Sequence, residues 1–198
     1  MIIKGSEKIY ITVFLDELMG FGDIMNSIGS GFGAIGGSLV NDLSILWLLT
    51  PILFFWIVLE VYFSKYQSEK LGWNTALGNG MSIFWILIIS MRELFSEGWS
   101  GLVWSRFFGL MILFVYTGFI IYNSFAHKLP EKVSFIIASP TITYYLSAVA
   151  ILWTFGGLVI TGWVILDLLL IYGVVLILEV ILKKYVQRET GGSSLGGL

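Results

Sequence analysis

The run WVILDLLLIYGVVLILEVILKK, residues 163–184, is interrupted by acids only at Asp167 and Glu179 and ends on two lysines. About 20 predominantly apolar residues are needed for a helix to cross the ~30 Å hydrocarbon core of a membrane. Loops that stay in the cytoplasm are enriched in lysine and arginine. The run therefore predicts a transmembrane helix over 163–182 that crosses toward the cytoplasm and ends at Lys183 and Lys184.

Four further apolar runs of similar length precede this one, at residues 43–63, 75–94, 102–122 and 140–160. The fourth begins with Ser139 and Pro140, which suit the N-cap and the first turn of a helix. The sequence thus predicts an all-α, polytopic integral membrane helix bundle. It has about five transmembrane helices, and six if the N-terminal segment also crosses.

The composition agrees with a membrane protein. Of the 198 residues, 57% are hydrophobic and 12% are charged, and the mean hydropathy is +0.90. A typical soluble domain has about 25% charged residues. The net charge of −2 offers no basic surface for nucleic acid, and the lack of cysteine excludes disulfides, thiolate metal sites and thiol nucleophiles.

The basic residues also predict an orientation. Most of them follow the first, third and fifth runs: Lys65, Lys70, Lys128, Lys132, Lys183, Lys184 and Arg188. Tryptophans gather at the opposite ends of the runs, where amphipathic rings favour the headgroup region: Trp47, Trp99, Trp104 and Trp163. We expect a multi-pass protein of the cell membrane with its N-terminus outside and its C-terminus in the cytoplasm.

The first forty residues carry a different pattern. Bulky apolar residues recur at steps of three and four, as on one face of a helix: Ile11, Phe14, Leu18, Phe21, Met25, Ile28, Phe32, Ile35 and Leu39. The other faces carry acids and glycines, including a small-residue ridge at Gly29, Gly33 and Gly37. Three arrangements fit this helix: lying in the outer membrane interface, packing closely through its glycines or re-entering the membrane, and crossing as a sixth span.

These patterns divide the chain into three parts. Residues 1–41 form an amphipathic, glycine-rich N-terminal segment, residues 42–185 form the transmembrane helix bundle, and residues 186–198 form a flexible Gly/Ser tail. An internal echo relates the ends of two spans, since residues 59–66 (LEVYFSKY) resemble residues 178–185 (LEVILKKY). This similarity fits an internal duplication. It also fits convergence, because two helices that both end on the cytoplasmic side would each favour an aromatic residue and a lysine there.

Charged residues near the outer ends of the spans form the first candidate site. Intramembrane charges are functional candidates because they are costly in hydrocarbon. The group comprises Arg92, Glu93, Arg106 and Asp167. It fits either an outer gate or ion site, or a structural ion pair between helices.

A second candidate site involves Glu60 and Glu179, which could bind a cation between two parallel helices. The alternative is that each glutamate is neutralised by a lysine of its own helix, as the spacing of Glu179 and Lys183 favours. Asn79 lies between two glycines inside the second span and marks either a helix contact or a ligand.

No catalytic, metal-binding or cofactor-binding pattern stands out, so we expect no cofactor and nothing indicates an enzyme. The sequence favours a non-catalytic subunit of a membrane-embedded, possibly transport-related assembly. The alternative is a small oligomeric transporter or channel that uses the outer charged group. The expected partners are the lipid bilayer and either further copies of this chain or other membrane subunits, with no nucleic acid.

Overall fold

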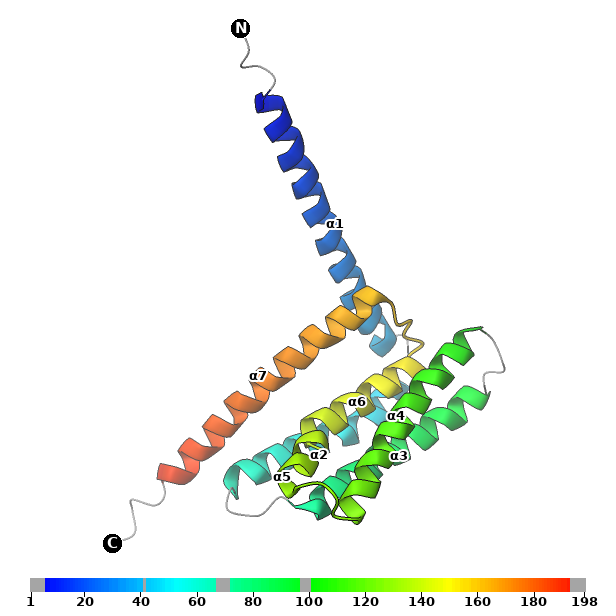
Figure 1. Cartoon of the computed structure of the whole chain (residues 1–198), viewed down its shortest axis with the longest axis vertical. Coiled ribbons are helices and arrows are strands. Elements are labelled where there is room, and N and C mark those ends of the chain that lie inside the picture. Colours follow the sequence, from blue (N-terminus) through cyan, green and yellow to red (C-terminus); the bar gives the residue numbers. More distant parts are fainter. Residues whose placement is uncertain (1–5, 41, 67–71, 97–100, 193–198) are drawn as a thin grey trace.

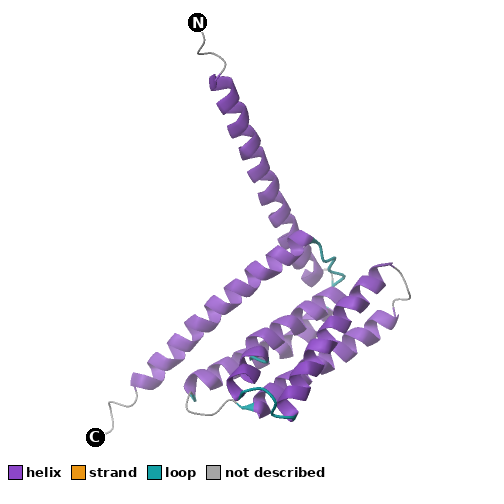
Figure 2. Ribbon diagram, in the orientation of Figure 1, coloured by secondary structure: helices purple, strands orange, loops and turns teal. Residues whose placement is uncertain are grey.

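The computed structural model describes the backbone of residues 6–40, 42–66, 72–96 and 101–192, and the side chains of this part except those of 6–19, 101–102 and 187–192. These residues form seven helices and no strand (Figure 1, Figure 2). The helices are α1 (Ser6–Val40), α2 (Ser44–Lys65), α3 (Trp73–Ser96), α4 (Gly101–Phe125), α5 (Glu131–Ile137), α6 (Pro140–Thr154) and α7 (Gly162–Gly192). Lys70, Trp99 and residues 193–198 lie outside the described residues.

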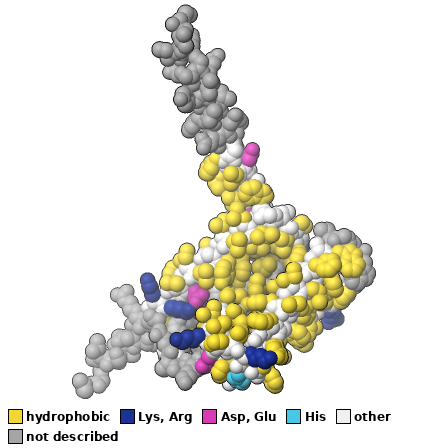
Figure 3. All heavy atoms as spheres, in the orientation of Figure 1, with side chains coloured by type: hydrophobic (Ala, Val, Ile, Leu, Met, Phe, Trp, Pro, Cys, Tyr) yellow, Lys and Arg dark blue, Asp and Glu magenta, His cyan; other side chains and the backbone are white. Residues whose placement is uncertain are grey.

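Five segments of the described chain are long and apolar enough to cross a membrane: α2, α3, α4, α5 together with α6, and α7. Large apolar side chains cover much of the face of the bundle seen in Figure 3. Ile112 and Val115 on α4 and Leu169 on α7 are each more than 60% exposed. Such a surface suits lipid, and the prediction of an all-α polytopic membrane bundle is confirmed.

The first three spans match the sequence closely, since α2, α3 and α4 each begin and end within three residues of the predicted runs. The last span differs at its end. Helix α7 continues to Gly192 rather than ending at Leu182, so it extends into the segment 186–198 that the sequence assigns to a tail.

The fourth span is a broken helix. Its predicted helix start at Pro140 is confirmed by α6, but the predicted end at 160 is wrong, and the span also includes α5. Helix α6 has 15 residues, about 22 Å at 1.5 Å per residue, which is too short to cross alone. Helix α5 supplies the missing length on one side. On the other side α6 ends at Thr154 because Gly157 adopts a positive φ of 63°, a conformation that favours glycine. Ser139 caps α6 as predicted, accepting a hydrogen bond from the backbone N–H of Ile142.

Side chains of α3 and α4 donate hydrogen bonds to the backbone carbonyl groups at the break between α5 and α6. Non-helical backbone at membrane depth is tolerated only where other protein groups supply the missing hydrogen bonds. The Nδ2 of Asn79 on α3 donates to the carbonyl of Ala138 at 2.7 Å, and the hydroxyl of Tyr116 on α4 donates to the carbonyl of Ile137. Asn79 therefore makes a helix contact, one of the two roles that its sequence position suggests.

Helix α6 lies at the centre of the bundle. One side of it packs against α3 and α4, through buried residues such as Leu87 and Leu110, and the other against α2 and α7, through Ile52 and Val164. Half of the α5–α6 span is buried, the largest share among the five spans. Polar groups on α6 are therefore enclosed by protein rather than by lipid.

Helix α1 leaves the bundle (Figure 1). It is one continuous helix of 35 residues, and its part with described side chains, residues 20–40, is not among the segments apolar enough to cross a membrane. Its C-terminal part touches the rest of the protein at two glycines, where Gly31 lies against Asp167 of α7 and Ser38 lies against Gly156. Its first half extends away from the other helices.

We expect Asn79→Leu to destabilise the protein by about 1–3 kcal/mol, because the buried carbonyl of Ala138 would lose its donor. The matched control is Asn74→Leu, since Asn74 lies on the same helix and is exposed. Thermal unfolding of the purified variants in detergent measures the difference. Equal midpoints for the two variants would contradict this role of Asn79.

Candidate functional site

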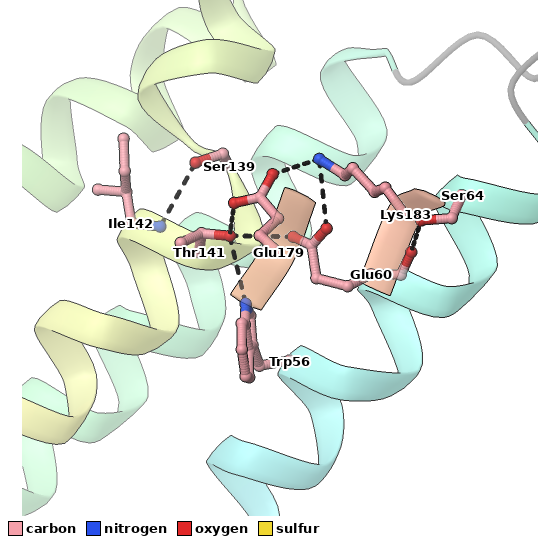
Figure 4. A network of polar contacts seen from close by, with 8 residues as sticks. All are labelled: Trp56, Glu60, Ser64, Ser139, Thr141, Ile142, Glu179 and Lys183. Atoms are coloured by element: carbon pink, nitrogen blue, oxygen red, sulfur yellow. Dashed lines mark hydrogen bonds and ion pairs between the residues drawn. The ribbon is translucent and has the colours of Figure 1, made fainter. Parts of the chain in front are cut away.

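The two glutamates of the internal echo come together in space. Glu60 lies near the end of α2 and Glu179 lies near the end of α7, and both carboxylates reach the hydroxyl of Thr141 in the first turn of α6 (Figure 4). Helices α2 and α7 both pack against α6. The break before Pro140 makes this meeting possible, because it starts a new helix at the depth of the two acids.

The oxygen atoms of this cluster lie at hydrogen-bond distances from one another. Thr141 Oγ1 is 3.0 Å from Glu60 Oε1 and 2.7 Å from Glu179 Oε2. The indole Nε1 of Trp56, on α2, donates to the same Oγ1 at 3.2 Å. Thr141 is 3% exposed and Glu60 is 3% exposed. The hydroxyl of Thr141 is therefore the centre of a buried polar network contributed by three helices.

One ammonium group faces both carboxylates. Lys183 Nζ is 3.4 Å from Glu60 Oε2 and pairs closely with Glu179 Oε1, the helical pair that the sequence predicted. The side chain of Lys183 is 39% exposed, so it links the buried network to the surface of the bundle. Lys65 on α2 does not serve as the partner of Glu60, since it is exposed and lies over the ring of Tyr66. The expectation that Glu60 is neutralised by a lysine of its own helix is therefore wrong.

The start of α6 also favours negative charge. The N-terminus of a helix carries a partial positive charge from its aligned peptide dipoles. Both carboxylates are held by a first-turn side chain of α6, so they lie near this positive end. The arrangement resembles the half-helix ends that bind charged groups in many transporters.

Asp167 of the outer group occupies a different place. It is fully buried, and neither of its carboxylate oxygens has a hydrogen-bond partner within the described part of the chain. One of these oxygens lies over the backbone of Gly31 on α1, 1.9 Å from where a Cβ atom would stand. Asp167 is therefore enclosed by the crossing of α1 and α7.

The other members of the outer group lie on α3 and α4. Arg106 is buried beside a cavity of about 180 Å³ lined by residues such as Ser105 and Trp153. Arg92 is exposed and Glu93 is half-buried. No hydrogen bond or ion pair joins Asp167 to these residues, so a gate or ion site built from all four stays a prediction.

Sequence reasoning found Glu60, Glu179 and Asn79 but missed Thr141 and Trp56. The Ser139–Pro140 pair indicates that Thr141 lies in a first turn, yet only the packing of α2 and α7 against α6 shows what its hydroxyl contacts. Asn79 does not join the cluster, since its amide binds the backbone of Ala138.

Comparisons with protein-family models, with curated proteins and with solved structures find no match for this chain. The site must therefore be interpreted from its own geometry.

We expect Lys183→Met to lower the stability of the protein at neutral pH, because the two carboxylates would lose the cation that they share. Breaking a buried ion pair costs about 3–5 kcal/mol, and the partial exposure of Lys183 favours the lower end of this range. Lys184→Met is the control, since Lys184 is the next residue and belongs to neither of these ion pairs. Thermal unfolding followed by tryptophan fluorescence measures both, and equal midpoints would show that Lys183 has no special role.

Proposed function

We propose that this protein is a non-catalytic subunit of a membrane-embedded assembly, and that α1 contacts the partner chains. The proposal rests on the uncovered glycines of α1. A Cβ atom added at Gly22, Gly29, Gly33 or Gly36 would have no other atom within 4 Å. These positions are separated by seven, four and three residues, so they share one face of the helix.

A glycine face suits another helix better than it suits lipid. Small residues let two helix backbones approach closely, and membrane helices associate through such faces. Helix α1 contains seven glycines, each costing about 1 kcal/mol relative to alanine, and contact with lipid alone does not compensate for this cost. Exposed apolar side chains lie beside the glycine face and would extend the contact: Phe21, Met25 and Phe32.

A small oligomeric transporter or channel is the alternative. It is supported by one buried and one half-buried carboxylate at two depths of α7, since Asp167 and Glu179 lie about 18 Å apart along the helix axis at 1.5 Å per residue. Intramembrane acids and broken helices recur at transport sites. The two proposals differ in the partner, which is another polypeptide in the first case and a further copy of this chain in the second.

We expect Gly29→Leu combined with Gly33→Leu to remove the protein from its assembly, because the new side chains would hold the partner helix away. The measurement is the mass of the complex extracted from native membranes, with its polypeptides identified by mass spectrometry. Gly118→Leu on α4 is the control, since Gly118 is also open and lies on another helix. A complex made only of this chain would favour the transporter, and a wild-type monomer would contradict both proposals.

We also propose that the lysine-rich end of the bundle faces the cytoplasm. The proposal is supported by contacts that bring the ends of three spans together. Phe63 on α2 packs against Phe135 on α5, and Glu60 on α2 pairs with Lys183 on α7. The lysines after the first, third and fifth runs would then share one side of the membrane, as the positive-inside rule requires.

Cysteine labelling measures this orientation, and the chain has no native cysteine to interfere. We expect a cysteine replacing Ser96 to react with a membrane-impermeant maleimide on intact cells. Cysteines replacing Ser68 and Ser193 should react only after the membrane is opened. Labelling of position 96 from the cytoplasmic side alone would reverse the orientation.

A further inference from the structure

We infer that Glu60 and Glu179 share one exchangeable proton through the hydroxyl of Thr141, so that this cluster is a proton-binding site which opens toward the Lys183 end of the bundle. The inference goes beyond membership of an assembly and does not depend on it. Two independent observations support the shared proton: the number of donors and acceptors around the hydroxyl of Thr141, and the net charge of Glu60, Glu179 and Lys183.

The hydrogen-bond count concerns the hydroxyl of Thr141. A hydroxyl has one hydrogen to donate and two lone pairs that accept. The indole N–H of Trp56 donates to one lone pair of this hydroxyl. The hydroxyl can then donate one further hydrogen bond and accept one. The two remaining neighbours are both carboxyl oxygens, of Glu60 and Glu179, at 3.0 and 2.7 Å. One of them can accept the hydroxyl hydrogen, and the other completes the set only if it carries a proton and donates.

The charge count gives the same answer. Two ionised carboxylates facing the single ammonium of Lys183 would leave one negative charge that only the partial positive charge of the α6 N-terminus opposes, and an incompletely paired charge is costly in a buried site. One bound proton makes the cluster neutral. Lys183 lies closer to Glu179 than to Glu60, so Glu179 holds the negative charge and Glu60 holds the proton.

Other titratable groups near Glu60 do not change this count. Helix α7 also contributes Tyr172, which lies within electrostatic range of Glu179. Helix α6 contributes Tyr144 and Tyr145, and the hydroxyl of Tyr145 donates to the carbonyl of Leu168. Helix α5 contributes Glu131 and Lys132, of which Glu131 is half-buried and Lys132 is exposed. None of the three tyrosines carries a positive charge that could replace the proton.

The distances favour a proton over a metal ion. Two neighbouring oxygen ligands of a metal ion, each bonded at about 2.0–2.6 Å and at a right angle to one another, lie about 2.8–3.7 Å apart. Thr141 Oγ1 and Glu179 Oε2 are only 2.7 Å apart, which fits a hydrogen between them. The ammonium of Lys183 already occupies the open side of both carboxylates.

The same atoms provide a path for exchange. The proton on Glu60 Oε1 can pass to Thr141 Oγ1 while the hydrogen of that hydroxyl passes to Glu179 Oε2, so one O–H bond breaks at each donor as another forms at each acceptor. The side chain of Glu60 is 4% exposed and that of Glu179 is 17% exposed. Exchange with water therefore takes place at Glu179, beside Lys183, and Glu60 is the inner end of the path.

Infrared spectroscopy of the full-length protein in lipid bilayers tests the inference. The wild-type protein at neutral pH should show the carbonyl band of a protonated carboxyl group that is lost in Glu60→Gln and equally lost in Glu179→Gln, because the remaining acid then ionises against Lys183. Glu131→Gln is the control and should keep the band. Any band from Asp167 is common to all variants and cancels in the difference spectra.

Three results would overturn the inference. A wild-type spectrum without this band would mean that both carboxylates are ionised, and a band that survives in Glu179→Gln would mean that the proton is not shared. A band that appears only when choline replaces sodium at constant pH would assign the site to a metal cation.

A second variant tests the path even if a glutamine variant fails to fold. Thr141→Val keeps the shape of the side chain but removes the hydroxyl, so the shift of the band in heavy water should become slower than in the wild-type protein. Thr154→Val is the control, since its buried hydroxyl binds only a carbonyl of its own helix. Equal exchange in both variants would show that the proton does not pass through Thr141.

Discussion

A helix interrupted inside a membrane exposes carbonyl groups where no water is present, and this fold depends on how the interruption between α5 and α6 is satisfied. Asn79 and Tyr116 supply the donors, which joins α3 and α4 to the broken span. The same interruption starts a new helix at Pro140, so that Thr141 lies in a first turn. One break therefore determines the packing on one side of α6 and the polar site on the other.

The protein holds its buried acids in two different ways. Glu60 and Glu179 lie in a network of hydrogen bonds and a shared ion pair, which three helices contribute. Asp167 has no such network and lies against the bare backbone of Gly31. A paired acid contributes to a specific arrangement of helices, whereas an unpaired one is costly to bury.

The sequence predicted most of the architecture, because the length of an apolar run follows directly from the thickness of a membrane. It failed at the fourth span, where it did not include α5 before Pro140 and carried the apolar run to residue 160, beyond the end of α6 at Thr154. The pair of Glu60 and Glu179 was suggested by their similar surroundings in the chain. Thr141 and Trp56 could not be found in this way, because a hydroxyl and an indole on apolar helices become a site only when three helices meet.

The contact of Gly31 with Asp167 has a mechanical consequence. Helix α1 is held near this crossing and extends about 25 residues beyond it, which makes a rigid arm of about 38 Å at 1.5 Å per residue. A rotation of only about 5° at the crossing would move the start of this arm by about 3 Å. A small change of angle where α1 crosses α7 would therefore be a much larger displacement at the start of α1.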